Sequence, residues 1–105
     1  METLTTKEFR KFYEKSFKKM TSVNFTIHFR KQEVSKIGYS VSKKNHKLAV
    51  ERNRIKRLLK AWIAESGAEL ASMELNLIVS KPLNLQDKSL ILLKEELITL
   101  LKKIK

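Results

Sequence analysis

Three segments of this chain alternate apolar and polar side chains with a period of two, and this pattern limits the possible folds more than any other feature. The segments are 24–30, 36–42 and 73–80. Because successive side chains of a strand point to opposite faces of its sheet, each segment predicts a strand with one apolar and one small or polar face. A sheet of such strands buries one face under helices and leaves the other lightly covered, available to a ligand. The apolar positions are Phe25, Ile27, Phe29, Ile37, Tyr39, Val41, Met73, Leu75, Leu77 and Val79.

The residues before the first alternating segment predict a helix that begins near Thr5. Thr5 and Glu8 have the spacing of a capping box, in which each side chain bonds the backbone N–H of the other residue. Leu4 and Phe9 have the spacing of a hydrophobic staple. This helix is expected to end at about residues 15–17.

Two further helices are expected from the remaining sequence. Strong helix formers extend from about residue 49 to residues 65–66, with Gly67 as the stop. The last helix begins near residues 87–89, after Pro82, and carries a stripe of core residues. The stripe consists of Leu90, Leu93, Leu97, Leu100, Leu101 and Ile104.

Together these elements predict an α+β fold in a single small domain, residues 1–105. The expected order is αβββαβα, with about four strands and three helices, if a short strand near residues 21–23 is counted. The first two alternating segments are joined by a short link at residues 31–35, which favours an antiparallel hairpin, although the link lacks a turn glycine.

The charge of the chain is large and unevenly distributed. It has 23 Lys and Arg against 11 Asp and Glu, a formal net charge of +12. Residues 1–60 hold 17 of the basic residues but 5 of the acidic ones, and residues 61–105 are neutral overall. The alternative to a binding surface is a generally charged, well-solvated protein, but the asymmetry favours a polyanionic partner, bound by phosphate neutralisation and counterion release.

Composition also excludes several classes of site. The absence of cysteine excludes disulfides, thiolate metal sites and cysteine nucleophiles. No apolar run approaches the roughly 20 residues that span a bilayer. The polar, acid-containing start of the chain does not resemble a signal or transit peptide. A soluble cytoplasmic protein with no membrane partner is therefore expected.

The stretch from Ala49 to Trp62 packs five cations into nine residues and still keeps apolar residues at helical spacing. Like charges three or four residues apart weaken an isolated helix by a few tenths of a kcal/mol per pair. Solubility alone does not require so many like charges on one helix, so their presence indicates another role. A nucleic-acid surface is favoured over a solvated basic face or a calmodulin-binding type of peptide, because this helix lies in mid-chain between strands. The polar residues of its outer faces are Arg52, Asn53, Arg54, Lys56, Arg57 and Lys60.

The run Gly38–Lys44 followed by Ala49–Leu58 resembles the signature of the bacterial ribonuclease P protein subunit, a G-x-S-V-S-K-K strand before an R-N-R-x-K-R helix. The resemblance covers nearly the whole chain. It includes a T-K-x-x-F-x-x-x-[FY] first helix, the segment Ile78–Pro82 and a final K-E-E-L-x-x-L-L helix. Residues 45–50 depart from the G-N/K-A-V turn that is common in this family.

The resemblance implies a fold of the ribosomal protein S5 domain 2-like class and a role as subunit of the endoribonuclease that matures the 5′ end of tRNA. The expected partners are a catalytic RNA, bound one to one by a monomeric protein, and precursor tRNA with its single-stranded 5′ leader. The RNA and its bound Mg²⁺ would carry the chemistry. Mg²⁺ would be held mainly by RNA and substrate phosphates rather than by a protein site, and no catalytic residue is expected on this chain.

The resemblance also assigns two sets of binding residues. Stacking on single-stranded bases is the role that aromatic rings of a leader-binding cleft can serve, although Phe9 and Tyr13 could also be core residues. His28 stands where relatives often have an aromatic residue, so its stacking should be weaker or pH-sensitive. The RNA-binding set is Ser42, Lys43, Lys44, Arg52, Asn53, Arg54, Lys56, Arg57 and Lys60. The leader-binding set is Phe9, Tyr13, His28 and Lys36.

Two other functions remain open at this point. One is a structural RNA-binding protein of the ribosomal type, with the same charge but no leader recognition. The other is a stand-alone ribonuclease in which His28 and His46 act as acid and base and a lysine stabilises the phosphorane.

Overall fold

The computed structural model describes residues 2–33, 35–66 and 72–104. Its elements in chain order are β1 (Glu2–Thr3), α1 (Thr6–Glu14), β2 (Lys18–Thr21), β3 (Phe25–Lys31), β4 (Lys36–Val41), α2 (Ala49–Ser66), β5 (Met73–Val79) and α3 (Asp87–Lys103). The predicted α+β class and the order αβββαβα are confirmed, with the two-residue β1 as an addition at the start. The predicted short strand near residues 21–23 lies earlier, as β2.

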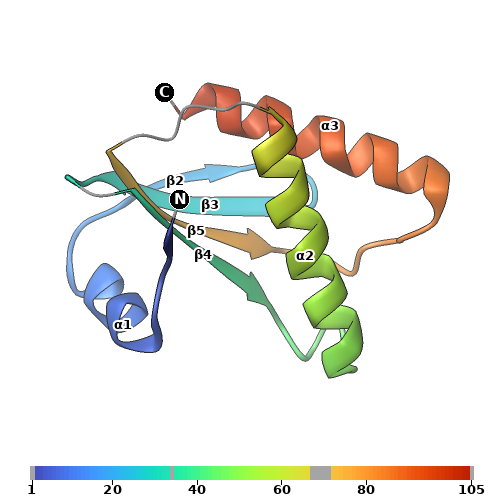
Figure 1. Ribbon diagram of the computed structural model, residues 1–105, viewed down its shortest axis with the longest axis horizontal. Helices are drawn as coiled ribbons and strands as arrows, with labels where there is room; N and C mark the ends of the chain where they lie inside the picture. Colours follow the sequence, from blue (N-terminus) through green and yellow to red (C-terminus); the bar gives the residue numbers. More distant parts are fainter. Residues whose placement is uncertain (1, 34, 67–71, 105) are drawn as a thin grey trace.

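One mixed sheet with the strand order β1-β4-β5-β3-β2 forms the centre of the structure (Figure 1). The predicted hairpin between the first two alternating segments is wrong, because β5 lies between β3 and β4 and pairs with both. The crossover through α2 returns the chain parallel to β4, which is the arrangement that a helical connection permits. The end of β3 at Lys31 and the start of β4 at Lys36 are therefore two strand spacings apart, about 10 Å. The actual hairpin is β2–β3.

The apolar face of the sheet is covered by α2 and α3, and the main core lies between these layers. Leu75 in β5 pairs with Ile37 on one side and Phe29 on the other, so the apolar positions form continuous rows across the sheet. Burying each large side chain of this kind contributes roughly 1.5–3 kcal/mol. The helices, with Ile104 directly after α3, contribute to the buried core the residues Ile55, Leu59, Trp62, Leu93, Leu97, Leu100, Leu101 and Ile104. The predicted stripe of α3 is thereby confirmed, with Leu90 packed at its margin.

The turn between β2 and β3 is tied to α3 by Glu96. Its carboxylate accepts hydrogen bonds from the Ser22 hydroxyl and from the backbone and side-chain nitrogens of Asn24, the latter two at 2.7 Å. Burial alone would raise the pKa of Glu96, but these bonds outweigh it and the pKa is lowered. The hairpin is therefore fixed to the helix layer at this turn.

Helix α1 lies on the other face of the sheet, away from α2 and α3 (Figure 1). The predicted capping box is present, since Thr5 N donates to Glu8 Oε1 at 3.1 Å and Glu8 N donates to Thr5 Oγ1 at 3.2 Å. The Phe9 ring rests directly on Gly38, where an added Cβ would lie 2.1 Å from the ring atom Cζ. Glycine at this strand position is what lets the helix approach the sheet.

None of the helices in the described parts of the chain is long and apolar enough to cross a membrane.

Candidate nucleic-acid interface

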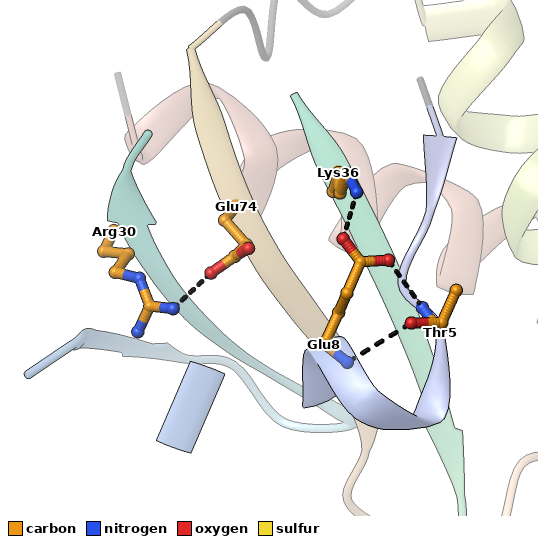
Figure 2. Close-up of polar contacts among 5 residues, drawn as sticks. All are labelled: Thr5, Glu8, Arg30, Lys36 and Glu74. Carbon is orange, nitrogen blue, oxygen red and sulfur yellow. Dashed lines mark hydrogen bonds and ion pairs between the residues drawn. The ribbon is translucent and has the colours of Figure 1, made fainter. Parts of the chain in front are cut away.

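Two ion pairs lie on the polar face of the sheet beneath α1 (Figure 2). One joins the helix to β4, and the other lies within the sheet and contacts the end of the helix through Arg30. At its start Glu8, already part of the capping box, pairs with Lys36 of β4. This ion pair and the bonds to Thr5 lower the pKa of Glu8 to about 2. The predicted cleft residue Lys36 therefore takes part in anchoring the helix.

The second ion pair joins Arg30 of β3 to Glu74 of β5, which are neighbours in the sheet (Figure 2). Their side chains are only 14% and 8% exposed. Arg30 also donates to the Phe12 carbonyl in the last turn of α1, and its guanidinium lies 4.4 Å from the centre of the Phe12 ring. Because a buried pair needs such additional bonds to offset its desolvation, this arrangement fixes the position of the end of α1.

The next row of the sheet, Gly38–Asn76–His28, carries a hydrogen-bond chain that reaches α1. Asn76 Nδ2 donates to the Tyr13 hydroxyl at 2.8 Å, and that hydroxyl lies 2.8 Å from His28 Nδ1. The amide nitrogen donates, so the Tyr13 oxygen accepts this bond. In the bond between the hydroxyl and His28 Nδ1, the tautomer of the histidine decides which group donates. Asn76 Oδ1 accepts from the Ser40 hydroxyl at 3.0 Å, so both ends of the amide are hydrogen-bonded.

Tyr13, Phe17 and His28 form a partly exposed group of rings, here called the aromatic cluster. The centre of the Phe17 ring lies 4.6 Å from that of His28 and 5.2 Å from that of Tyr13. Tyr13 and Phe17 are 43% and 38% exposed, unlike the buried rings of the core. Desolvation and the charge of Lys19 lower the pKa of His28, so the neutral form is favoured. Partly exposed rings of this kind provide surfaces on which bases stack.

The four predicted leader-binding residues have different contacts in the structure. Tyr13 and His28 are in contact, whereas Phe9 packs on Gly38 and Lys36 binds Glu8. Phe17 and Asn76 belong to this site but were not predicted from the sequence. Two features of the sequence could have identified them. Phe17 follows Tyr13 by four residues, and Asn76 is a polar amide in the middle of the last strand.

Beyond the aromatic cluster, the polar face continues toward the loop between β4 and α2. The next row is Ser40, Ile78 and Thr26, and the Thr26 and Ser80 hydroxyls lie 2.8 Å apart there. Ser42 directly follows β4, and the start of α2 lies beside the same end of that strand (Figure 1). A strand of small and polar side chains thus leads from the aromatic cluster to the loop.

The loop at residues 42–48 is held in one conformation by several bonds. His46 is buried (4% exposed), and its Nε2 accepts from the backbone nitrogen of Leu83 at 3.1 Å. Ser42 accepts at its carbonyl from His46 N and at its hydroxyl from Asn45 N. The exposed side chains of Lys43 and of the residue after it, Lys44, are presented by this ordered turn.

The placement of the histidines does not favour the stand-alone ribonuclease. His28 lies in the aromatic cluster with Nδ1 bonded to Tyr13, while His46 is buried beneath the loop with Nε2 bonded to backbone. An acid–base pair must reach the same phosphate, and a buried ring that supports a loop is poorly placed to do so.

Helix α2 presents the predicted basic residues in three different environments. Arg52 Nη1 donates to the carbonyls of His46 and Lys47, both at 2.9 Å, so this arginine helps to order the loop. Lys60 lies over the ring of Tyr39, with its nitrogen 5.7 Å from the ring centre. Among the predicted residues of this helix, Lys56 is half-buried, and Asn53, Arg54, Arg57 and Lys60 are exposed.

Within residues 2–33, 35–66 and 72–104, no three or more His, Asp or Glu side chains gather in a way that could hold a metal ion. The donors on this surface are instead cationic groups, amides and rings, which suit phosphates and bases.

Comparisons with known proteins agree on one family. The family described as Ribonuclease P matches residues 2–105. The ribonuclease P protein component of Ureaplasma parvum is 36% identical over 67 residues, covering 62% of this chain and 59% of that protein. That of Bacillus velezensis is 38% identical over 76 residues, covering 67% of this chain and 65% of that protein. The match thus spans less than two thirds of the length of either relative.

The solved structure of the RNase P protein from Thermotoga maritima superposes with a TM-score of 0.82 at 25% identity, covering 100% of this chain and 99% of that one. The similarity therefore extends to the whole arrangement of helices and strands.

Proposed function

The chain belongs to the ribonuclease P protein family, and from this premise we propose that it is the RNA-binding subunit of a ribonucleoprotein that removes the 5′ leader of precursor tRNA. The catalytic RNA carries the phosphodiester chemistry, and the protein supplies binding and orientation. The observation that carries the proposal is the aromatic cluster, joined by a polar strand face to an ordered basic loop.

The proposed division of labour follows the two surfaces. The loop and the exposed face of α2 bind the catalytic RNA and the adjacent part of the substrate, because arginine forks and lysine ammonium groups suit phosphate oxygens. The residues proposed for this surface are Ser42, Lys43, Lys44, Arg52, Asn53, Arg54, Lys56, Arg57 and Lys60. Arg52 acts partly through the loop, whose carbonyls it binds.

The aromatic cluster binds unpaired bases of the leader. Tyr13 and Phe17 supply exposed ring surface, and base stacking on such rings contributes roughly 1–3 kcal/mol per base. The ring of His28, whose Nδ1 is bonded to the Tyr13 hydroxyl, meets a base through its Nε2. Phe9 and Lys36 support this site by holding α1 on the sheet.

Mg²⁺ supports the phosphodiester chemistry in this proposal, and it is held by RNA and substrate phosphates. The described part of the chain offers no carboxylate cluster of the kind that two-metal nucleases use. The protein's own contribution is to neutralise phosphates and to orient the leader.

Multiple-turnover cleavage of precursor tRNA by a bacterial ribonuclease P RNA at low Mg²⁺, with and without this protein, tests the proposal. We expect the protein to stimulate cleavage at the 5′ end of the mature tRNA, and the protein freed of RNA to cleave nothing. Cleavage by RNA-free protein, or a ribozyme unaffected by its addition, would contradict the proposal. A ribosomal-type protein would copurify with ribosomal RNA and leave cleavage unchanged.

The same assembly provides a test of the basic face. Arg57→Ala should weaken binding to the catalytic RNA by roughly 1–3 kcal/mol and flatten its salt dependence, because a phosphate contact is lost. Arg52→Ala should weaken binding at least as much, because it also frees the loop. Filter binding across a salt series measures both, and an unchanged salt slope for Arg57→Ala would remove this residue from the interface.

A further inference from the structure

A cavity of about 670 Å³ opens beneath the C-terminal end of α3. It lies at the end of the sheet opposite to the loop at residues 42–48. It lies where β2 and β5 begin and β3 ends, on the side of the sheet that elsewhere forms the core. Its size falls within the range of roughly 300–1,000 Å³ that is usual for ligand pockets. Neither the basic face of α2 nor its preceding loop contributes to its lining.

The described lining of the cavity combines an apolar wall with cationic side chains, and it includes no acidic side chain. Phe29, Met73 and Ile104 form buried parts of its wall. The exposed lysines Lys18, Lys31 and Lys103 lie around it and come from β2, β3 and α3.

The register of the sheet shows how these charges reach the core side. Lys18 pairs with Phe29 and Lys31 with Met73, so both lysines occupy positions that the alternation assigns to apolar residues. An apolar surface surrounded by cations without a lining acid suits a ligand that is both anionic and flat or apolar. A nucleotide has this combination.

Phe17 connects this cavity to the aromatic cluster. Its ring contacts the ring of His28 at an interplanar angle of 36°, and the same residue lines the cavity beside Ser16 and Lys18. A single strand lying on the aromatic cluster could therefore continue around Phe17 to the cavity without leaving the protein surface.

We propose that this cavity binds one further nucleotide of the single-stranded leader, with its base on the apolar wall and its phosphate beside Lys18, Lys31 and Lys103. The inference rests on the proposed function, and it extends the leader-binding path beyond the aromatic cluster. Recognition here is tolerant of sequence, because stacking and phosphate contacts read no base edges.

The test uses the assembled ribonucleoprotein and precursors whose leaders are lengthened one nucleotide at a time. With the wild-type protein, the affinity of the ribonucleoprotein for the precursor should rise once when the leader is long enough to reach the aromatic cluster. It should rise again when the leader reaches the cavity. Lys31→Ala/Lys103→Ala should remove the second rise, a loss of roughly tenfold for long leaders. The matched control is Lys88→Ala/Lys102→Ala, which removes the same charge from exposed positions of α3 outside the cavity.

Three results would overturn the inference. The first is the absence of a second rise in affinity with the wild-type protein. The second is an equal loss of affinity for the cavity variant and the control at every leader length. The third is free AMP that saturates the cavity without competing with long leaders. A second measurement does not depend on variants: 4-thiouridine at the leader position of the second rise should photo-crosslink to peptides containing Phe17 or Lys103, and crosslinking elsewhere would also overturn it. If leader length has no effect at all, the proposed function itself fails.

Discussion

The two faces of the sheet are built on different principles. The face toward α2 and α3 is a continuous apolar layer, in which attraction is roughly proportional to buried area and has little directional requirement. The face toward α1 uses two ion pairs, a hydrogen-bond chain and a glycine that admits Phe9. The difference indicates that the face toward α2 and α3 supplies most of the stability. The face toward α1 instead holds polar and aromatic groups in a defined arrangement.

Two consecutive residues of β5 show this contrast at its sharpest. Asn76 and Leu77 are 3% and 0% exposed, so both are buried, but they point to opposite faces. Leu77 packs among apolar neighbours, whereas both ends of the Asn76 amide are hydrogen-bonded, to Tyr13 and Ser40. Burial alone therefore does not distinguish a core position from a site position in this strand.

The largest expected effect comes from the apolar face. Leu77→Ala should lower the free energy of unfolding by about 3 kcal/mol, because it removes buried methyl groups and leaves a cavity. Urea unfolding measures the loss. The protein that remains folded should still prefer leader-bearing precursor to mature tRNA, and a specific loss of this preference would contradict the separation of the two faces.

A smaller loss of stability, with a specific loss of function, is expected on the polar face. Gly38→Ala places a Cβ against the Phe9 ring and should cost roughly 1–3 kcal/mol as α1 shifts. Affinity for leader-bearing precursor should fall more than affinity for the catalytic RNA. Adding Phe9→Leu makes room for the new methyl group and should restore part of both losses, whereas failure of this rescue would show that the contact does not position α1.

The smallest effect concerns the charge of His28. Its folded pKa is lowered from the usual 6.5 by desolvation and by Lys19, so the unfolded chain binds this proton more readily. The contribution of neutral His28 to the free energy of unfolding is therefore complete above pH 6.5, and it is lost as the pH falls through the lowered pKa of the folded state. Lys19→Ala should raise the His28 pKa and reduce this loss, which NMR titration and unfolding at several pH values can measure. An unchanged or lower His28 pKa would contradict this assignment.

The sequence predicted much of the apolar face because that face follows periodicity. Alternation identified the buried rows of three strands, the stripe of α3 was confirmed, and the S/T-x-x-E spacing located the start of α1. The hairpin between β3 and β4 was mispredicted because strand pairing depends on where the α2 crossover places β5, which is a matter of the whole fold.

The polar face was less predictable because its contacts join distant parts of the chain. Nothing local in the Phe9 or Tyr13 pattern indicated that α1 covers the polar side of the sheet rather than the core side. The bond from Asn76 to Tyr13 joins residues 63 positions apart. On α2, the helical angle identified the basic rows, but the bonds from Arg52 to the loop carbonyls depend on the path of a loop that has no periodicity.

The most direct test of the central claim is the ratio of holoenzyme affinities for leader-bearing precursor and mature tRNA. Tyr13→Ala/Phe17→Ala should lower this ratio roughly tenfold or more by removing the exposed stacking surface, with the affinity for mature tRNA unchanged. Ile91→Ala/Leu92→Ala, which removes exposed apolar side chains from α3, is the matched control and should leave the ratio unchanged. An unchanged ratio for Tyr13→Ala/Phe17→Ala in a folded protein, or an equal loss for both RNAs, would contradict the claim that the aromatic cluster reads the leader.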